Sequence, residues 1–128
     1  MEEKYNQLIK MAQAIQEFLE QDVSDNPNDL VDRLSTINTF LATSGKALAD
    51  AKLLQDSKVK KLYDDYFNQI SGFSPTVATK FINAMTDKEN YLVNWLDRIN
   101  RTLVHSGDNI RTQVSFAKEE LRLTKQGY

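Results

Sequence analysis

Two short stretches of the sequence combine residue types that carry chemistry in other proteins. Ser44-Gly45-Lys46 has the Gly-Lys step of a phosphate-binding loop. The other glycines of such a loop are missing, and the surroundings predict a helix, whose amides are not free to bind phosphate. His105, Ser106 and Asp108 are the residue types of a catalytic triad, but on a helix Ser106 falls on the buried stripe while His105 points away from it. Neither stretch predicts an active site.

Metal binding and acid–base chemistry would need carboxylates or histidines that converge. The adjacent pairs Asp64-Asp65 and Glu119-Glu120 do not converge, because neighbouring residues on a helix point about 100° apart. The Glu-x-x-His motif of helical di-metal sites does not occur, and the chain has no cysteine and one histidine. We therefore expect no metal, no cofactor and no enzymatic activity.

Basic residues are concentrated toward the C-terminus. Residues 1–70 carry eight Lys and Arg against twelve Asp and Glu, whereas residues 71–128 carry eight against six. The cations expected to contact nucleic acid or a partner form two rows on the last predicted helix: Arg98, Arg101 and His105, and then Arg111, Lys118 and Arg122. Arginine suits phosphate because its guanidinium is a planar fork of donors. Asp97, Asp108 and Glu119 interrupt these rows, so an ordinary solvated helix face is the competing interpretation.

Length and composition limit the fold. A chain of 128 residues suits a single domain, 1–128, and its hydrophobic content of 41% can supply a core. Two prolines and four glycines are too few for the many turns of a sandwich or a barrel. No stretch approaches the ~18 apolar residues of a membrane span. The acidic start Met1-Glu2-Glu3 is the opposite of a signal peptide, so we expect a cytoplasmic protein without membrane association.

Hydrophobic periodicity predicts helices along nearly the whole chain. They run over about residues 3–21, from a cap at Asn26 or Asn28 to Ser71, from Ser74 to Met85, and over about 87–125. A phase shift near 55–57 allows a kink in the second helix, which we take as continuous, and Thr86 to Glu89 matches a capping box. The last helix alone would span roughly 55–60 Å. The expected fold is all-α: an elongated helical bundle built on a long antiparallel helix pair, with a shorter N-terminal helix and a short connecting helix.

An internal repeat links the two long helices. Residues 34–45 and 96–107 both fit Leu-x-x-Ile-Asn-x-x-Leu-x-x-Ser-Gly, which is six identities in twelve positions. Small residues on the apolar stripe allow two helix backbones to approach closely. The positions expected to serve helix packing are Ser44, Gly45, Ser106 and Gly107. In an antiparallel pair the two Ser-Gly steps would meet near the middle.

Apolar residues also lie off the main stripe of the last helix. Tyr91 and Trp95 require a second partner within the chain, either the first or the third helix. Phe116 and Leu123 lie apart from the stripe that includes Leu121, on a surface that is otherwise polar. We therefore predict a homo-oligomer that associates through Phe116 and Leu123.

Two stretches carry a family resemblance. They are Leu41–Lys52 (LATSGKALADAK) and Trp95–His105 (WLDRINRTLVH), the latter continuing to RTQVS at 111–115 and KEE at 118–120. They resemble small all-helical proteins from the early regions of bacteriophages and prophages, near genes for DNA replication or recombination. The resemblance covers most of residues 30–122 as a pattern, carries over no catalytic residue, and implies an accessory protein in the cytoplasm of a bacterial host cell.

The expected function follows from this resemblance and from the absence of a plausible catalytic set in the sequence. We expect a non-enzymatic phage-type protein that binds a host or phage protein, for example to inhibit a host defence system or to assist phage DNA metabolism. The alternative is a protein that binds single-stranded nucleic acid or a nucleotide with its arginine-bearing C-terminal helix.

Overall fold

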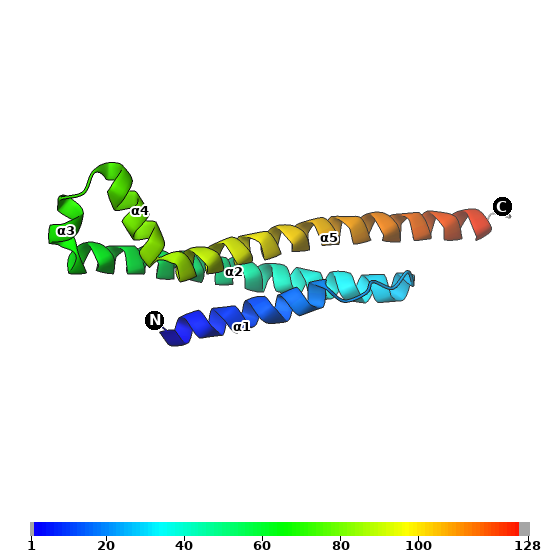
Figure 1. Ribbon diagram of the computed structural model, residues 1–128. Helices are drawn as coiled ribbons and strands as arrows, with labels where there is room; N and C mark the ends of the chain where they lie inside the picture. Colours follow the sequence, from blue (N-terminus) through cyan, green and yellow to red (C-terminus); the bar gives the residue numbers. More distant parts are fainter. Residues whose placement is uncertain (1, 126–128) are drawn as a thin grey trace.

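The computed structural model describes residues 2–125, and their secondary structure is entirely helical, which confirms the all-α fold. The helices are α1 (Glu2–Leu19), α2 (Pro27–Asp65), α3 (Phe67–Ser71), α4 (Pro75–Met85) and α5 (Asp87–Lys125). Figure 1 shows an elongated molecule in which α2 and α5 lie side by side, with α1 along one half and α3 and α4 folded back at one end.

Two side-chain hydrogen bonds set the antiparallel register of α2 and α5. The amide Nδ2 of Asn100 donates to Oγ of Ser44 at 2.9 Å, and Nε2 of Gln55 donates to Oδ1 of Asn90 at 2.6 Å. Counted residue by residue from the first pair, Pro27 at the start of α2 lies opposite Ala117 on α5. The C-terminal part of α5 therefore extends past α2, as Figure 1 shows.

Helix α1 completes a three-helix core. Its buried residues Leu8, Ala12 and Ile15 pack with the buried residues of α2 and α5. Trp95 of α5 is half-buried, and its Nε1 donates to Oε1 of Gln16 on α1 at 3.1 Å. The first helix is thus the second partner of the apolar face around Trp95. The expectation is wrong for Tyr91, whose side chain is 61% exposed.

The helix starts are decided locally. Asn26 caps α2 by accepting a hydrogen bond from the amide of Asn28 at 2.9 Å, and Ser74 caps α4 by accepting one from the amide of Val77 at 3.3 Å. In both helices a proline follows the cap, where its missing N–H would have been unpaired anyway.

The second long helix ends earlier than predicted. It passes through residues 55–57 without a break and stops at Asp65, because Tyr66 leaves the helical conformation and separates α2 from α3. The Tyr66 ring packs against Phe81 of α4, with 5.4 Å between the ring centroids. This contact belongs to a second small core formed by Leu62, Ile70 and Ile82. Tertiary packing at this end therefore overrides the helical periodicity that continues to Ser71.

The predicted capping box at the start of α5 does not form. The hydroxyl of Thr86 is buried, donates to the carbonyl of Ile82 at 2.8 Å and accepts from Nδ2 of Asn90 at 3.1 Å. The amide of Lys88 is instead bound by the carboxylate of Asp87 at 2.8 Å. Because α4 runs almost directly into α5, the threonine hydroxyl serves the end of α4.

The two copies of the repeat are buried differently. On α5, Leu96 and Leu103 are fully buried, whereas their counterparts on α2, Leu34 and Leu41, are only half-buried. The buried residues of α2 instead include Ser44, which lies against Asn100 of α5. The repeat is therefore real as a sequence pattern but is not used symmetrically.

The Ser-Gly steps do not meet, contrary to prediction. Ser44 lies against Asn100, and a Cβ on Gly107 would be 3.5 Å from Cγ2 of Ile37. The assignment of Gly45 as a packing residue is wrong, since it is exposed and a Cβ there would meet nothing within 4 Å. Ser106 is half-buried. Of the two glycines, only Gly107 occupies a helix–helix contact.

Candidate functional site

The apolar stripe of α5 becomes exposed where α2 no longer covers it. Leu103 is 0% exposed, Ile110 is 3% exposed and Leu121 is 57% exposed. The expectation that Leu121 lies on a buried stripe is therefore wrong, because α2 begins only opposite Ala117. We call residues 118–125 of α5 the overhang; at 1.5 Å per residue it is about 12 Å long.

Phe116 lies on another side of the same helix. It is 67% exposed, and its side chain points about 140° away from that of Leu121 around the helix axis. Leu123, two turns further on, is 38% exposed on the Phe116 side. A shallow hollow of about 480 Å³ lies here, lined by Arg111, Thr112, Ser115, Phe116 and Glu119. We call these five residues, together with Leu123, the Phe116 surface.

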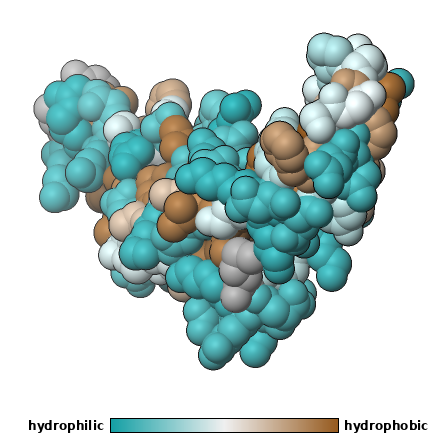
Figure 2. All heavy atoms as spheres, turned by 90° about the vertical axis from the view of Figure 1, so that its left-hand side faces the viewer, coloured by the Kyte–Doolittle hydropathy of each residue, from teal (hydrophilic) through white to brown (hydrophobic). Residues whose placement is uncertain are grey.

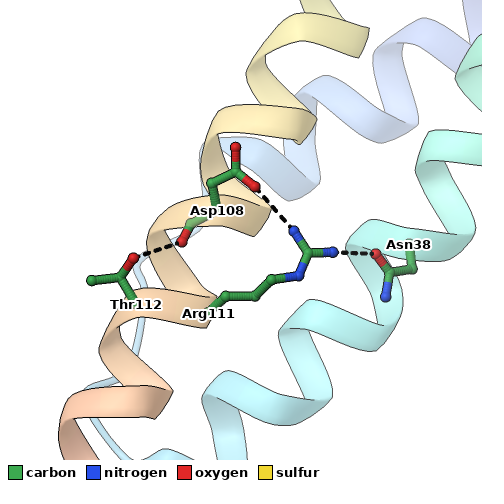
Figure 3. A network of polar contacts seen from close by, with 4 residues as sticks. All are labelled: Asn38, Asp108, Arg111 and Thr112. Carbon is green, nitrogen blue, oxygen red and sulfur yellow. Dashed lines mark hydrogen bonds and ion pairs between the residues drawn. The ribbon is translucent and has the colours of Figure 1, made fainter.

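Arg111 is held in place at the edge of the Phe116 surface. Its Nη1 is 3.1 Å from Oδ1 of Asp108 on α5, and its Nη2 donates to Oδ1 of Asn38 on α2 at 3.4 Å (Figure 3). Thr112 donates to the carbonyl of Asp108 at 3.1 Å in the same network. A Cβ on Gly107 would lie 3.4 Å from Nη1 of Arg111, which is van der Waals contact, so the guanidinium packs directly beside this position. The network therefore connects the surface to both long helices.

Lys118 and Arg122, which form the predicted row with Arg111, do not converge on it. Arg122 donates from Nε to Oε2 of Glu119 at 3.2 Å, and this hydrogen bond raises the pKa of the guanidinium above its ordinary value. Lys118 is exposed on the overhang. The predicted row of three cations is thus divided among separate local environments.

The other predicted row of cations lines a single hollow. Arg98, Arg101 and His105 line a shallow hollow of about 470 Å³ on the outward side of α5. Arg101 is also paired with Asp97, with 3.2 Å between Nη2 and Oδ2. His105 is exposed, and it points away from the helix–helix contact as predicted.

Four exposed apolar side chains near the α3–α4 end were not predicted from the sequence. They are Tyr63, Phe67, Phe73 and Val77. Figure 2, which looks onto this end, shows hydrophobic surface interrupting the hydrophilic surface. The sequence spacing indicates that two of them are exposed, because Tyr63 and Phe67 are four residues apart and lie off the apolar stripe of Leu62 and Tyr66.

Within residues 2–125, no group of three or more His, Asp or Glu side chains is arranged to hold a metal ion. Over the same range, no helix is both long and apolar enough to cross a membrane. No protein-family model, curated protein or solved structure matches the chain.

Proposed function

We propose that this protein is a non-enzymatic, phage-type interaction protein that binds a host or phage protein through the Phe116 surface. The observation that carries the proposal is the strongly exposed Phe116 ring beside an arginine fixed by Asn38 and Asp108. Aromatic residues and arginine are the types that contribute most to binding energy at protein interfaces.

The physical state of this surface favours binding. Burying the side chain of Phe116 contributes roughly 1.5–3 kcal/mol. Arg111 already has partners on both long helices, so it loses little side-chain freedom when a partner docks. The antiparallel pair of α2 and α5 acts as the rigid support, and a long outward helix face suits recognition by a groove or by another helix.

The biological setting is proposed from the sequence resemblance alone. Leu41–Lys52 and Trp95–His105 resemble small helical proteins of phage early regions, which act inside a bacterial cell. The partner would then belong to a host defence system or to the DNA metabolism of the phage.

Affinity capture from bacterial lysate tests this function. The wild-type chain is compared with Phe116→Ser/Leu123→Ser and with Leu53→Ser, a control change of an equally exposed residue on α2. We expect wild type and control to retain the same protein partner and the double variant to lose it, with unchanged circular dichroism. Retention by all three, or capture of nucleic acid with no protein, would contradict the proposal.

The alternative function is binding of single-stranded nucleic acid or a nucleotide. It is favoured by the hollow that Arg98, Arg101 and His105 share, and by the exposed Tyr91 ring two turns before Arg98, on which a base could stack. Trp95 is already engaged with α1. Fluorescence anisotropy of labelled oligonucleotides tests this alternative at low and moderate salt, and calorimetry tests nucleotides. Binding must weaken steeply with salt because phosphate contacts release counterions. No binding in either assay would eliminate it.

A further inference from the structure

We infer that α3 and α4 form a flap, residues 67–85, that opens as one unit about Tyr66 and Thr86 while the three-helix core stays folded. Opening uncovers apolar surface at the end of α2, which the closed flap keeps away from water. The inference goes beyond the proposed function and does not depend on it, because the flap contains no residue of the Phe116 surface.

The flap and the three-helix core have separate apolar interiors. The flap packs on the small core of Leu62, Ile70 and Ile82, and among the described residues none belongs to both this core and the three-helix core. Gln55 and Asn90, whose hydrogen bond joins α2 to α5, lie between the two cores along the chain. The small core can therefore come apart without removing a side chain from the large one.

Burial in the flap is shallow. Only Ile70 and Ile82 are buried, at 8% and 9% exposed, and Ala78 and Phe81 are half-buried. Every other residue of the flap is exposed. In the three-helix core, by contrast, a side chain such as Leu103 is 0% exposed. Proteins open locally where few apolar side chains are buried, so the flap should open at a lower free energy than the three-helix core.

Polar side chains do not tie the flap to the rest of the protein. The hydroxyl of Ser71 donates to the carbonyl of Phe67 at 2.7 Å, which is a contact within the flap. Within residues 2–125, no ion pair includes a flap residue. Over the same range, the one side-chain hydrogen bond that reaches the flap from outside comes from Thr86, which donates to the carbonyl of Ile82. Opening therefore breaks apolar contacts and almost no polar ones.

Two residues of matching backbone conformation flank the flap. Tyr66 has φ −120° and ψ 27°, and Thr86 has φ −115° and ψ 22°, so each separates two helices that follow each other directly along the chain. Positions at the ends of helices are those that absorb the backbone rotations of a hinge motion. Figure 1 shows α3 and α4 folded back together at one end of the molecule, where such a rotation would swing both helices at once.

Hydrogen exchange of the full chain, followed by mass spectrometry, tests the flap. In the wild type, the amides of α3 and α4 should exchange at least about tenfold faster than those in the middle of α2 and α5. Ile82→Ala should speed exchange in the flap by at least about tenfold more and leave the three-helix core unchanged. Leu103→Ala is the matched control, which should speed exchange in that core and leave the flap unchanged. Equal acceleration of both regions by either change would show that they open together and would overturn the inference.

Thiol labelling measures access to the surface beneath the flap. The chain has no cysteine, so Leu62→Cys reports on the small core and Ile110→Cys on the three-helix core, at two positions that are each 3% exposed. Without denaturant, Leu62→Cys should be labelled at least about tenfold faster, and its rate should depend less on urea because opening the flap exposes little surface. Equal rates with equal urea dependence would reject the flap. Phe116→Ser/Leu123→Ser should leave this labelling unchanged, and Ile82→Ala should leave partner capture intact, so the flap and the proposed function fail in distinguishable ways.

Discussion

The side-chain amide of Asn100 donates a 2.9 Å hydrogen bond to the hydroxyl of Ser44, joining the two copies of the internal repeat across the antiparallel helix pair. The pairing follows from the repeat itself, because Asn precedes the second Leu by three residues and Ser follows it by three. When Leu41 faces Leu103, each Asn is opposite a Ser. The equivalent Asn38 is exposed and accepts from Arg111 instead.

Removing this hydrogen bond should destabilise the helix pair. We expect Ser44→Ala to lower the free energy of unfolding by about 1–3 kcal/mol, because it leaves the half-buried Asn100 amide without this acceptor. In a double-mutant cycle with Asn100→Ala, urea denaturation should give a coupling energy of about 1 kcal/mol. Additive effects would show that the pair does not fix the register.

The two glycines of the repeat should respond in opposite ways to a side chain. Gly107→Leu should lower the free energy of unfolding by about 1–3 kcal/mol, because Ile37 and the Arg111 guanidinium already occupy the nearby space. Gly45→Ala should raise it by roughly 0.5–1 kcal/mol, since the position is open and glycine is a poor helix former. Urea denaturation of both variants measures the contrast. Equal effects would contradict the different burial of the repeat copies.

The carboxylate of Asp50 should make the attachment of α1 sensitive to acid. Hydrogen bonds from Lys46 and then Lys4 hold the pKa of Asp50 below its ordinary value. The ionised Asp50 carboxylate therefore gives its full contribution to stability above the ordinary Asp pKa of about 3.9. This contribution is lost as the pH falls through the lower pKa of the folded state.

Asp50→Asn measures this contribution. The variant should lose less stability than wild type between about pH 6 and pH 2 in thermal unfolding. Lys10→Met serves as a control, because it changes an exposed lysine of α1 without touching Asp50. An identical acid dependence in wild type and Asp50→Asn would contradict the expected role of Asp50.

Buried and exposed positions of α5 should separate stability from association. Leu103→Ala should lower the free energy of unfolding by about 2–5 kcal/mol, because it removes a fully buried side chain. Phe116→Ser should change it by less than about 0.5 kcal/mol, as for other exposed positions. Thermal and urea unfolding check both values. A large loss from Phe116→Ser would place this ring in the fold, not in a binding surface.

Much of the fold follows from interactions within a few residues of the chain. The spacing of apolar residues predicted the long helices correctly, and the Asn26 and Ser74 caps lie where the chain supplies a side-chain acceptor before a proline. Among the candidate site residues, the outward position of His105 and the exposure of Phe116 were also predictable. These features are local because helix phase fixes which side chains point away from an apolar stripe.

Other features depended on partners that are distant in the sequence. The copies of the repeat are alike, yet Gly107 is buried against Ile37 and Leu34 of α2, whereas nothing lies within 4 Å of a Cβ on Gly45. Leu121 continues the same stripe as Leu103 but is exposed, since α2 starts too late to cover it. Arg111 is directed toward Asn38, 73 residues earlier in the chain. The sequence by itself determined where helices form and which side of each is apolar; only the tertiary structure decided how much of each apolar side is covered, because coverage depends on where the neighbouring helices begin, end and turn.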